Sequence, residues 1–123
     1  MIKNILLVSL GGGIGGIARY LCQKWFAANY THSFPWATFA VNITGCFLIG
    51  IFWGLSFRSP GYSESWKLFL MTGLCGGFTT FSAFALEGIG LVKEQKLVLF
   101  FSYMAASVVL GLLATYTGIR LTK

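Results

Sequence analysis

The residues with the most unusual chemistry lie in the middle of a long apolar stretch, at positions 73–84. They read Gly-Leu-Cys-Gly-Gly-Phe-Thr-Thr-Phe-Ser-Ala-Phe. Adjacent glycines and adjacent threonines weaken a helix. Phe81 and Phe84 are three residues apart, so a helix that resumes there presents both rings on one face. Lipid cannot satisfy the backbone groups that an interrupted helix frees. We therefore predict a broken helix, stabilised by protein, water or an ion, as the functional site.

The composition of the 123-residue chain is typical of a membrane protein. Apolar residues make up 56% of it, charged residues only 10%, and the mean hydropathy is +0.76, whereas soluble domains carry about 25% charged residues. Four apolar stretches exceed the roughly 20 helical residues that cross a bilayer. They cover residues 4–26, 36–57, 66–92 and 97–119. We predict one all-α membrane domain, residues 1–123, with four transmembrane helices, the third broken near mid-membrane. We expect no cleaved signal peptide, because no cleavage-like site follows the first apolar run.

The nine lysines and arginines divide almost evenly between the two ends of the predicted helices. One side holds Lys3, Arg58, Lys67, Arg120 and Lys123, and the other holds Arg19, Lys24, Lys93 and Lys96. The positive-inside rule orients a chain by an imbalance, and five against four is almost none. A chain without a preferred orientation inserts both ways, which supplies the two partners of an antiparallel, dual-topology homodimer. Since the basic residues form no patch, we expect no nucleic-acid binding.

Several polar residues lie inside the predicted spans. Asn42 needs a partner there, which is either another helix or a permeant anion that its amide faces. Thr38 lies one turn earlier and is expected on the same side. Tyr103 and Ser107, four residues apart, share a face of the fourth span. Such hydroxyls either bond to their own backbone or form a polar track that faces Asn42 and Ser82.

Two charged residues near the ends of spans are open to more than one interpretation. Arg19 either extends to the membrane surface or has a structured role, tying loop carbonyls or drawing anions to a vestibule. Glu87, the one acidic residue inside a span, either couples to ions or protons or is solvated or paired with Lys93. His32 lies in a loop and has no serine, aspartate or metal partner in the pattern. No nucleophile–base pair is recognisable, so the sequence does not predict an enzyme.

The sixteen glycines favour close packing of helices. Gly11, Gly13 and Gly16 match a dinucleotide-binding pattern, but that pattern needs an acidic residue about 20 positions later and alternating strands and helices. The first acidic residue is Glu64. We interpret the glycines as small-xxx-small packing pairs. The pairs are Gly11/Gly15, Gly12/Gly16, Gly50/Gly54 and Gly73/Gly77. The three cysteines, at positions 22, 46 and 75, have neither disulfide nor metal spacing and are interpreted as small apolar packing residues.

With these residues in view, the chain resembles the Fluc (CrcB-type) fluoride channel family over nearly its whole length. Segments 12–20, 36–45 and 76–84 carry the resemblance, and the last of them is the most specific. The chain has Ala83 where the family often has threonine, and Ala37 where a glycine often precedes the threonine. Neither difference removes a residue that the mechanism needs.

The resemblance implies a fluoride-selective channel that exports fluoride passively and lowers cytoplasmic fluoride, as a multi-pass protein of the plasma (inner) membrane. It implies a dual-topology homodimer with two antiparallel pores and a central structural Na⁺ bound by carbonyls of Gly76 and Thr79. It also implies that Phe81 and Phe84 line the pores and that Asn42 handles fluoride. The hydroxyls able to donate to fluoride are those of Ser82, Ser107 and Tyr103.

Two other classes of membrane protein fit the sequence less well. A small dual-topology proton-coupled transporter is the alternative, but it requires a carboxylate buried in the first span, and no acidic residue precedes Glu64. A structural membrane subunit has no need of a polar interruption in its third helix. The sequence therefore favours the channel.

Overall fold

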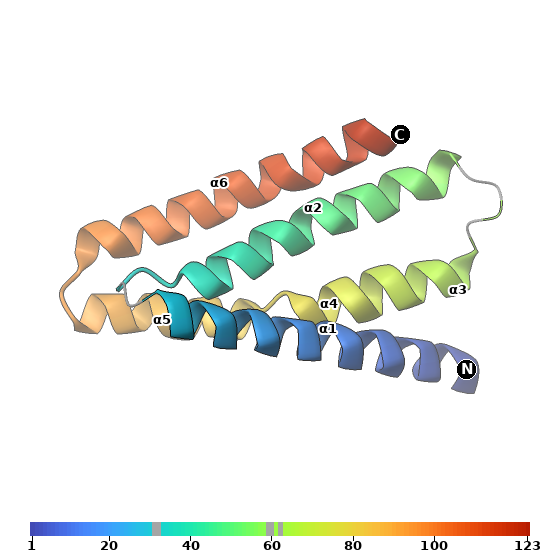
Figure 1. The fold of residues 1–123 in the computed structure, drawn as a ribbon. Helices are drawn as coiled ribbons and strands as arrows, with labels where there is room; N and C mark the ends of the chain where they lie inside the picture. Colours follow the sequence, from blue (N-terminus) through green and yellow to red (C-terminus); the bar gives the residue numbers. More distant parts are fainter. Residues whose placement is uncertain (31–32, 59–60, 62) are drawn as a thin grey trace.

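The computed structural model describes residues 1–30, 33–58, 61 and 63–123. Regular structure in these residues is all helical, and four segments are long and apolar enough to cross a membrane (Figure 1). They are α1 (Ile2–Asn29), α2 (Trp36–Arg58), a third segment (Glu64–Lys93) and α6 (Leu97–Thr122). The all-helical class is confirmed, and each of the four predicted spans coincides with a helical segment that is able to cross a membrane. The limits differ most at two C-terminal ends. α1 ends at Asn29 and not at residue 26, and α6 ends at Thr122 and not at residue 119. His32 lies outside the described residues.

The third segment consists of four shorter elements. They are α3 (Glu64–Lys67), η1 (Leu68–Cys75), α4 (Gly76–Phe78) and α5 (Phe81–Lys93). The element η1 is a π-helix, whose wider turn is rare and often found at functional sites. Between α4 and α5 the backbone is extended, with φ −86° and ψ 158° at Thr79 and φ −149° and ψ 116° at Thr80. The Thr80 side chain accepts a hydrogen bond from the Ala83 N–H and so caps α5.

Two of the predicted glycine pairs bring α1 against the third segment. α1 packs along η1 and α4, and both Gly11 and Gly15 are buried. A Cβ on Gly15 would collide with the backbone of η1, and one on Gly77 would collide with the backbone of α1. A Cβ on Gly73 would lie 3.0 Å from the Cα of Gly11, which is also tighter than an ordinary contact. The two backbones approach to a distance that no larger residue permits, which is the packing that small-xxx-small pairs allow. Gly16 has open space around it and does not pack in this way.

The other large contact joins α2 to α6 along most of their length (Figure 1). A Cβ on Gly50 or Gly54 of α2 would collide with residues of α6, and one on Gly118 of α6 would collide with α2. Thr115 Oγ1 donates to the Cys46 carbonyl at 3.0 Å across this contact. The molecule therefore consists of two tightly packed layers, α1 with the third segment and α2 with α6.

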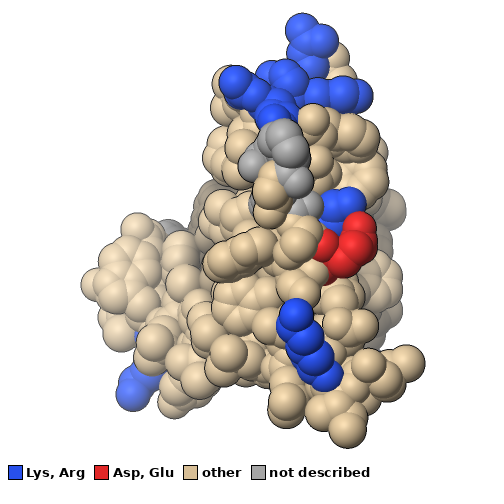
Figure 2. Space-filling view, turned by 90° about the vertical axis from the view of Figure 1, so that its right-hand side faces the viewer, with Lys and Arg blue, Asp and Glu red and all other residues tan. Residues whose placement is uncertain are grey.

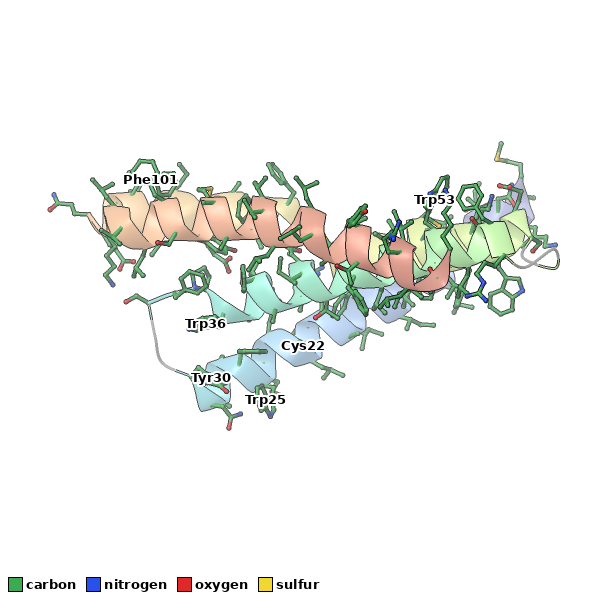
Figure 3. The ribbon with its side chains drawn as sticks, turned by 90° about the horizontal axis from the view of Figure 1, so that it is seen from above. Cys22, Trp25, Tyr30, Trp36, Trp53 and Phe101 are labelled. Atoms are coloured by element: carbon green, nitrogen blue, oxygen red, sulfur yellow. The ribbon has the colours of Figure 1, made fainter. Side chains whose placement is uncertain are left out.

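The aromatic and charged side chains at the ends of the helices match a membrane-crossing position. Figure 3 shows Trp25, Tyr30 and Trp36 towards one end of the molecule and Trp53 towards the other. Aromatic side chains of this kind gather at both membrane–water interfaces. Both termini lie at the same end (Figure 1), and Figure 2, which faces that end, shows a cluster of lysine and arginine side chains there. Polar ends and aromatic anchors thus bracket an apolar middle.

Candidate ion pathway beside Thr79 and Thr80

Asn42 of α2 holds the extended residue Thr80 by both of its backbone groups. Asn42 Nδ2 donates to the Thr80 carbonyl at 3.1 Å, and Asn42 Oδ1 accepts from the Thr80 N–H at 2.7 Å. α2 can come this close because Gly45 has no Cβ, since one there would collide with the Thr79 side chain. Asn42 thus has the first of its two predicted roles, a hydrogen-bonded contact with another helical segment. Its contact with an anion stays a prediction.

Two backbone N–H groups, those of Thr80 and Ala83, do not donate to the carbonyls that they would bond to in a continuous α-helix. In an α-helix the N–H of each residue donates to the carbonyl four residues earlier. Thr80 would then donate to Gly76, and Ala83 would donate to Thr79. Here the Thr80 N–H donates to Asn42 and the Ala83 N–H donates to the Thr80 hydroxyl. The carbonyls of Gly76 and Thr79, the two residues predicted to bind Na⁺, therefore lack their usual helical donors.

Arg19 and Thr79 satisfy the neighbouring carbonyls. Arg19 Nε of α1 donates to the Gly77 carbonyl at 3.1 Å in a partly buried position. The Thr79 N–H and the Thr79 hydroxyl both donate to the Cys75 carbonyl, each at 3.0 Å. Arg19 thus ties a carbonyl at the end of α4, one of the roles that the sequence left open. A vestibule role for Arg19 stays a prediction.

Three aromatic rings lie together where α5 meets α6. The ring centroids of Phe81 and Phe84 are 5.7 Å apart. Phe84 also meets Tyr103 of α6 edge-on, with centroids 5.0 Å apart and an interplanar angle of 61°. Tyr103 is completely buried, whereas Phe81 is 79% exposed. One ring of the predicted pair therefore packs inside this chain and the other projects from it.

An open cavity of about 420 Å³, here called the Asn42 cavity, is lined by residues of α2, the third segment and α6. Six of the residues predicted for the site line it: Asn42, Gly76, Thr79, Phe81, Phe84 and Ser107. Ser107 Oγ is buried and has no hydrogen-bond partner among the described residues. A buried hydroxyl normally has a partner, so among the described residues Ser107 has an unused donor just behind the wall of this cavity.

Two predicted hydroxyls, those of Ser82 and Tyr103, are not in the lining of the Asn42 cavity. Ser82 Oγ lies 3.3 Å from Thr80 Oγ1 on an exposed residue. The Tyr103 hydroxyl donates to Glu87 Oε1 at 3.0 Å, and Thr38 Oγ1 donates to Glu87 Oε2 at 2.8 Å. The expected single row of hydroxyls is thus divided, because Tyr103 points towards the Glu87 carboxylate.

Glu87 accepts hydrogen bonds from neutral hydroxyl groups and is not paired with Lys93, the cation that the sequence offers as a partner. Its two oxygens accept from Thr38 and Tyr103, both completely buried, and among the described residues it makes no ion pair with Lys93. A second cavity, of about 260 Å³, reaches Thr38 and Glu87 from the loop between α1 and α2. The carboxylate therefore lies between this cavity and the buried Tyr103.

Comparison with known proteins places the chain in a family. The family model described as "CrcB-like protein, Camphor Resistance (CrcB)" matches residues 6–119, which include the whole site. The chain belongs to the CrcB-like family.

Relatives of this CrcB-like chain carry a name that states a function. A protein of Flavobacterium psychrophilum named "Fluoride-specific ion channel FluC" is 46% identical over 121 residues, which cover 98% of each chain. Proteins of the same name from Leptospira interrogans and Phocaeicola vulgatus are 42% and 46% identical over 121 residues. These matches cover 98% of this chain in both cases and 95% and 99% of the relatives.

Sequence reasoning about this CrcB-like chain missed two of the site's partners. The sequence predicts only that Thr80 weakens a helix, whereas its backbone is the partner of Asn42. The spacing predicts Thr38 on the same side as Asn42 but does not predict its hydrogen bond to Glu87. A signal was available for the second, because a carboxylate in an apolar span needs donors and Thr38 is one of few in α2.

Proposed function

We propose that this chain is a fluoride-selective channel through which fluoride leaves the cytoplasm passively across the plasma (inner) membrane. The observation that carries the proposal is the Asn42 cavity. It brings together the amide of Asn42, the rings of Phe81 and Phe84 and the residue Ser107 in one apolar setting. The buried hydroxyl of Ser107 has no hydrogen-bond partner in the part of the chain that the structure describes. The name of the relatives, "Fluoride-specific ion channel FluC", agrees with this chemistry.

Fluoride is small and strongly hydrated, so a dry pathway must replace its water by hydrogen-bond donors. The Asn42 amide has two N–H groups, and only one of them is used on Thr80. Ser107 supplies a second donor, and the edges of Phe81 and Phe84 carry partial positive charge that an anion can approach. Ser82 joins the pathway beside Thr80. Tyr103 would first have to exchange its bond to Glu87.

We propose that two copies assemble as an antiparallel, dual-topology homodimer. The Asn42 cavity is open and Phe81 is 79% exposed. A second copy would enclose both, and lipid cannot satisfy the carbonyls of Gly76 and Thr79. The near-equal distribution of basic residues favours insertion in both orientations. Aromatic anchors at both ends of the molecule (Figure 3) allow either end to lie in either interface.

We further propose that a structural Na⁺ lies on the dimer axis. The available ligands fit such an ion, because Na⁺ is a hard cation that prefers oxygen. The carbonyl oxygens of Gly76 and Thr79 lack the N–H groups that would donate to them in a continuous helix. The same two carbonyls from each subunit would hold it. A bound Na⁺ supplies a buried positive charge that lowers the cost of bringing an anion to mid-membrane.

Fluoride efflux from liposomes tests the function directly. Reconstituted protein should discharge a fluoride gradient when a K⁺ ionophore balances charge, and should retain chloride. Ser107→Ala should slow the efflux, whereas Ser102→Ala, at an exposed position of the same helix, should leave it unchanged. Equal efflux of chloride would contradict selectivity. Fluoride efflux that requires a proton gradient would support the proton-coupled transporter instead.

A further inference from the structure

Three residues that carry sulfur are in the lining of the Asn42 cavity. They are Cys46 of α2 and Met71 and Cys75 of η1. Met71 and Cys75 are four residues apart, about one helical turn, and therefore lie on the same face. Both cysteines are free thiols, and Cys75 is only 3% exposed. The sequence interpretation of the cysteines as separate packing residues does not account for this convergence, because residues 46 and 75 come from different spans.

The side chain of Thr79 shows how close the two cysteine-bearing elements are. A Cβ on Gly45, the neighbour of Cys46, would collide with Thr79 Cγ2. The hydroxyl of the same Thr79 donates to the Cys75 carbonyl at 3.0 Å. A single side chain therefore spans the distance between α2 at Gly45 and the end of η1 at Cys75. The backbone of α2 next to Cys46 is therefore held close to the end of η1. The Cys46 sulfur lies 3.5 Å from the position that a Cβ on Gly111 of α6 would take, in the same cavity wall as Met71 and Cys75.

We propose that Cys46, Cys75 and Met71 form a binding site for a soft monovalent metal ion of the class of Cu⁺ and Ag⁺. Thiolate and thioether sulfur select such ions, which need few ligands. A thiol loses its proton when it binds a metal, so each Ag⁺ that enters releases one H⁺ from a cysteine. The exchange leaves the net charge of the apolar cavity unchanged. Na⁺ prefers oxygen, so this site is chemically distinct from the proposed carbonyl site.

An ion bound by these sulfurs also reaches the proposed pathway. It occupies the cavity that Asn42 and Phe84 line, and one of its ligands belongs to Cys75, whose carbonyl accepts both donors of Thr79. We therefore expect the metal to block fluoride flux. This second expectation rests on the proposed function, whereas binding of the metal does not.

Silver binding to the purified chain tests the site without any transport assay. Protein in a chloride-free nitrate buffer is titrated with Ag⁺, gel-filtered and assayed for bound silver by mass spectrometry. Cys46→Ser and Cys75→Ser replace a soft ligand by a hard one of similar size, and each should weaken binding by more than the roughly 10–100-fold typical of losing an outer-shell partner. Cys22→Ser is the matched control, because Cys22 lies on α1 (Figure 3) and is not among the residues that line the cavity.

A protection experiment on the wild-type chain keeps the proposal testable if a variant does not fold. Stoichiometric Ag⁺ should protect Cys46 and Cys75, but not Cys22, from alkylation by a small membrane-permeant reagent, as read from peptide masses. Unchanged silver affinity in the Cys46→Ser/Cys75→Ser double variant, or equal protection of all three cysteines, would overturn the proposal. In liposomes, Ag⁺ should block fluoride efflux through the wild type and Cys22→Ser but not through Cys46→Ser. Protein that binds silver at this site yet conducts no fluoride would overturn the function alone.

Discussion

Replacing Asn42 by alanine removes both hydrogen bonds that hold Thr80 in its extended conformation. Asn42→Ala leaves the Thr80 N–H and carbonyl without the partners that now lie 2.7 and 3.1 Å away. The freed N–H then competes for the Gly76 carbonyl, its normal acceptor in a continuous helix. We therefore expect two effects together, a loss of stability and a loss of the backbone arrangement at Gly76 on which the proposed Na⁺ site depends.

The size of the stability loss follows from the number and setting of these bonds. Each buried backbone group left without a partner costs about 1–3 kcal/mol, which gives about 2–6 kcal/mol for two groups. Hydrogen bonds between membrane helices average only about 0.6 kcal/mol, which gives about 1.2 kcal/mol for the pair. Asn42 is half-buried and in contact with an open cavity, so water can replace part of the loss. We expect a decrease of about 1–3 kcal/mol in the free energy of unfolding.

Denaturant titration in detergent and fluoride efflux from liposomes measure the two effects on the same preparations. Thr44→Ala, at an exposed position of α2, is the matched control and should leave both unchanged. Asn42→Asp keeps an oxygen that accepts from the Thr80 N–H, and when its carboxyl group binds a proton it also has an O–H that can donate to the Thr80 carbonyl. The stability of this variant should therefore fall less than that of Asn42→Ala, and least at low pH. An Asn42→Ala protein within about 0.5 kcal/mol of the wild type, the range of ordinary surface substitutions, would refute the reasoning.

Three further predictions concern the pathway and the assembly. Phe81→Ile or Phe84→Ile should strongly reduce fluoride efflux while leaving a folded dimer. Normal efflux with lowered thermal stability would instead indicate that the rings serve packing, since their removal leaves cavities. Labelling at Lys123 should find about half of the C-termini on each side of the membrane, as the even charge distribution requires, and a uniform orientation would contradict dual topology. Gly76→Val should abolish Na⁺ binding and Thr79→Ser should preserve it, judged by anomalous scattering. Cation density that persists in Gly76→Val would count against the carbonyl site.

The sequence alone determined where the chain crosses an apolar layer and where its backbones come close. Span length is a local property, because about 20 apolar residues suffice for a crossing whatever the neighbours are. The glycine pairs at positions 11/15, 50/54 and 73/77 mark helix faces without side chains, and these faces pack closely against other helices. The unusual composition of segment 73–84 marks residues that line the Asn42 cavity. The depth of this segment in a membrane stays a prediction.

Only the tertiary structure decided which polar group meets which. Asn42 bonds to Thr80, and Tyr103 and Thr38 bond to Glu87 and not to a row of hydroxyls. These pairings depend on how each helix is rotated about its axis, and that rotation is set by glycine contacts between spans distant in sequence. The π-helical turn of η1 is also visible only in the tertiary structure. A π-helical turn is a local change in hydrogen bonding, which a pattern of apolar residues does not reveal, and in this structure it occurs where η1 packs along α1.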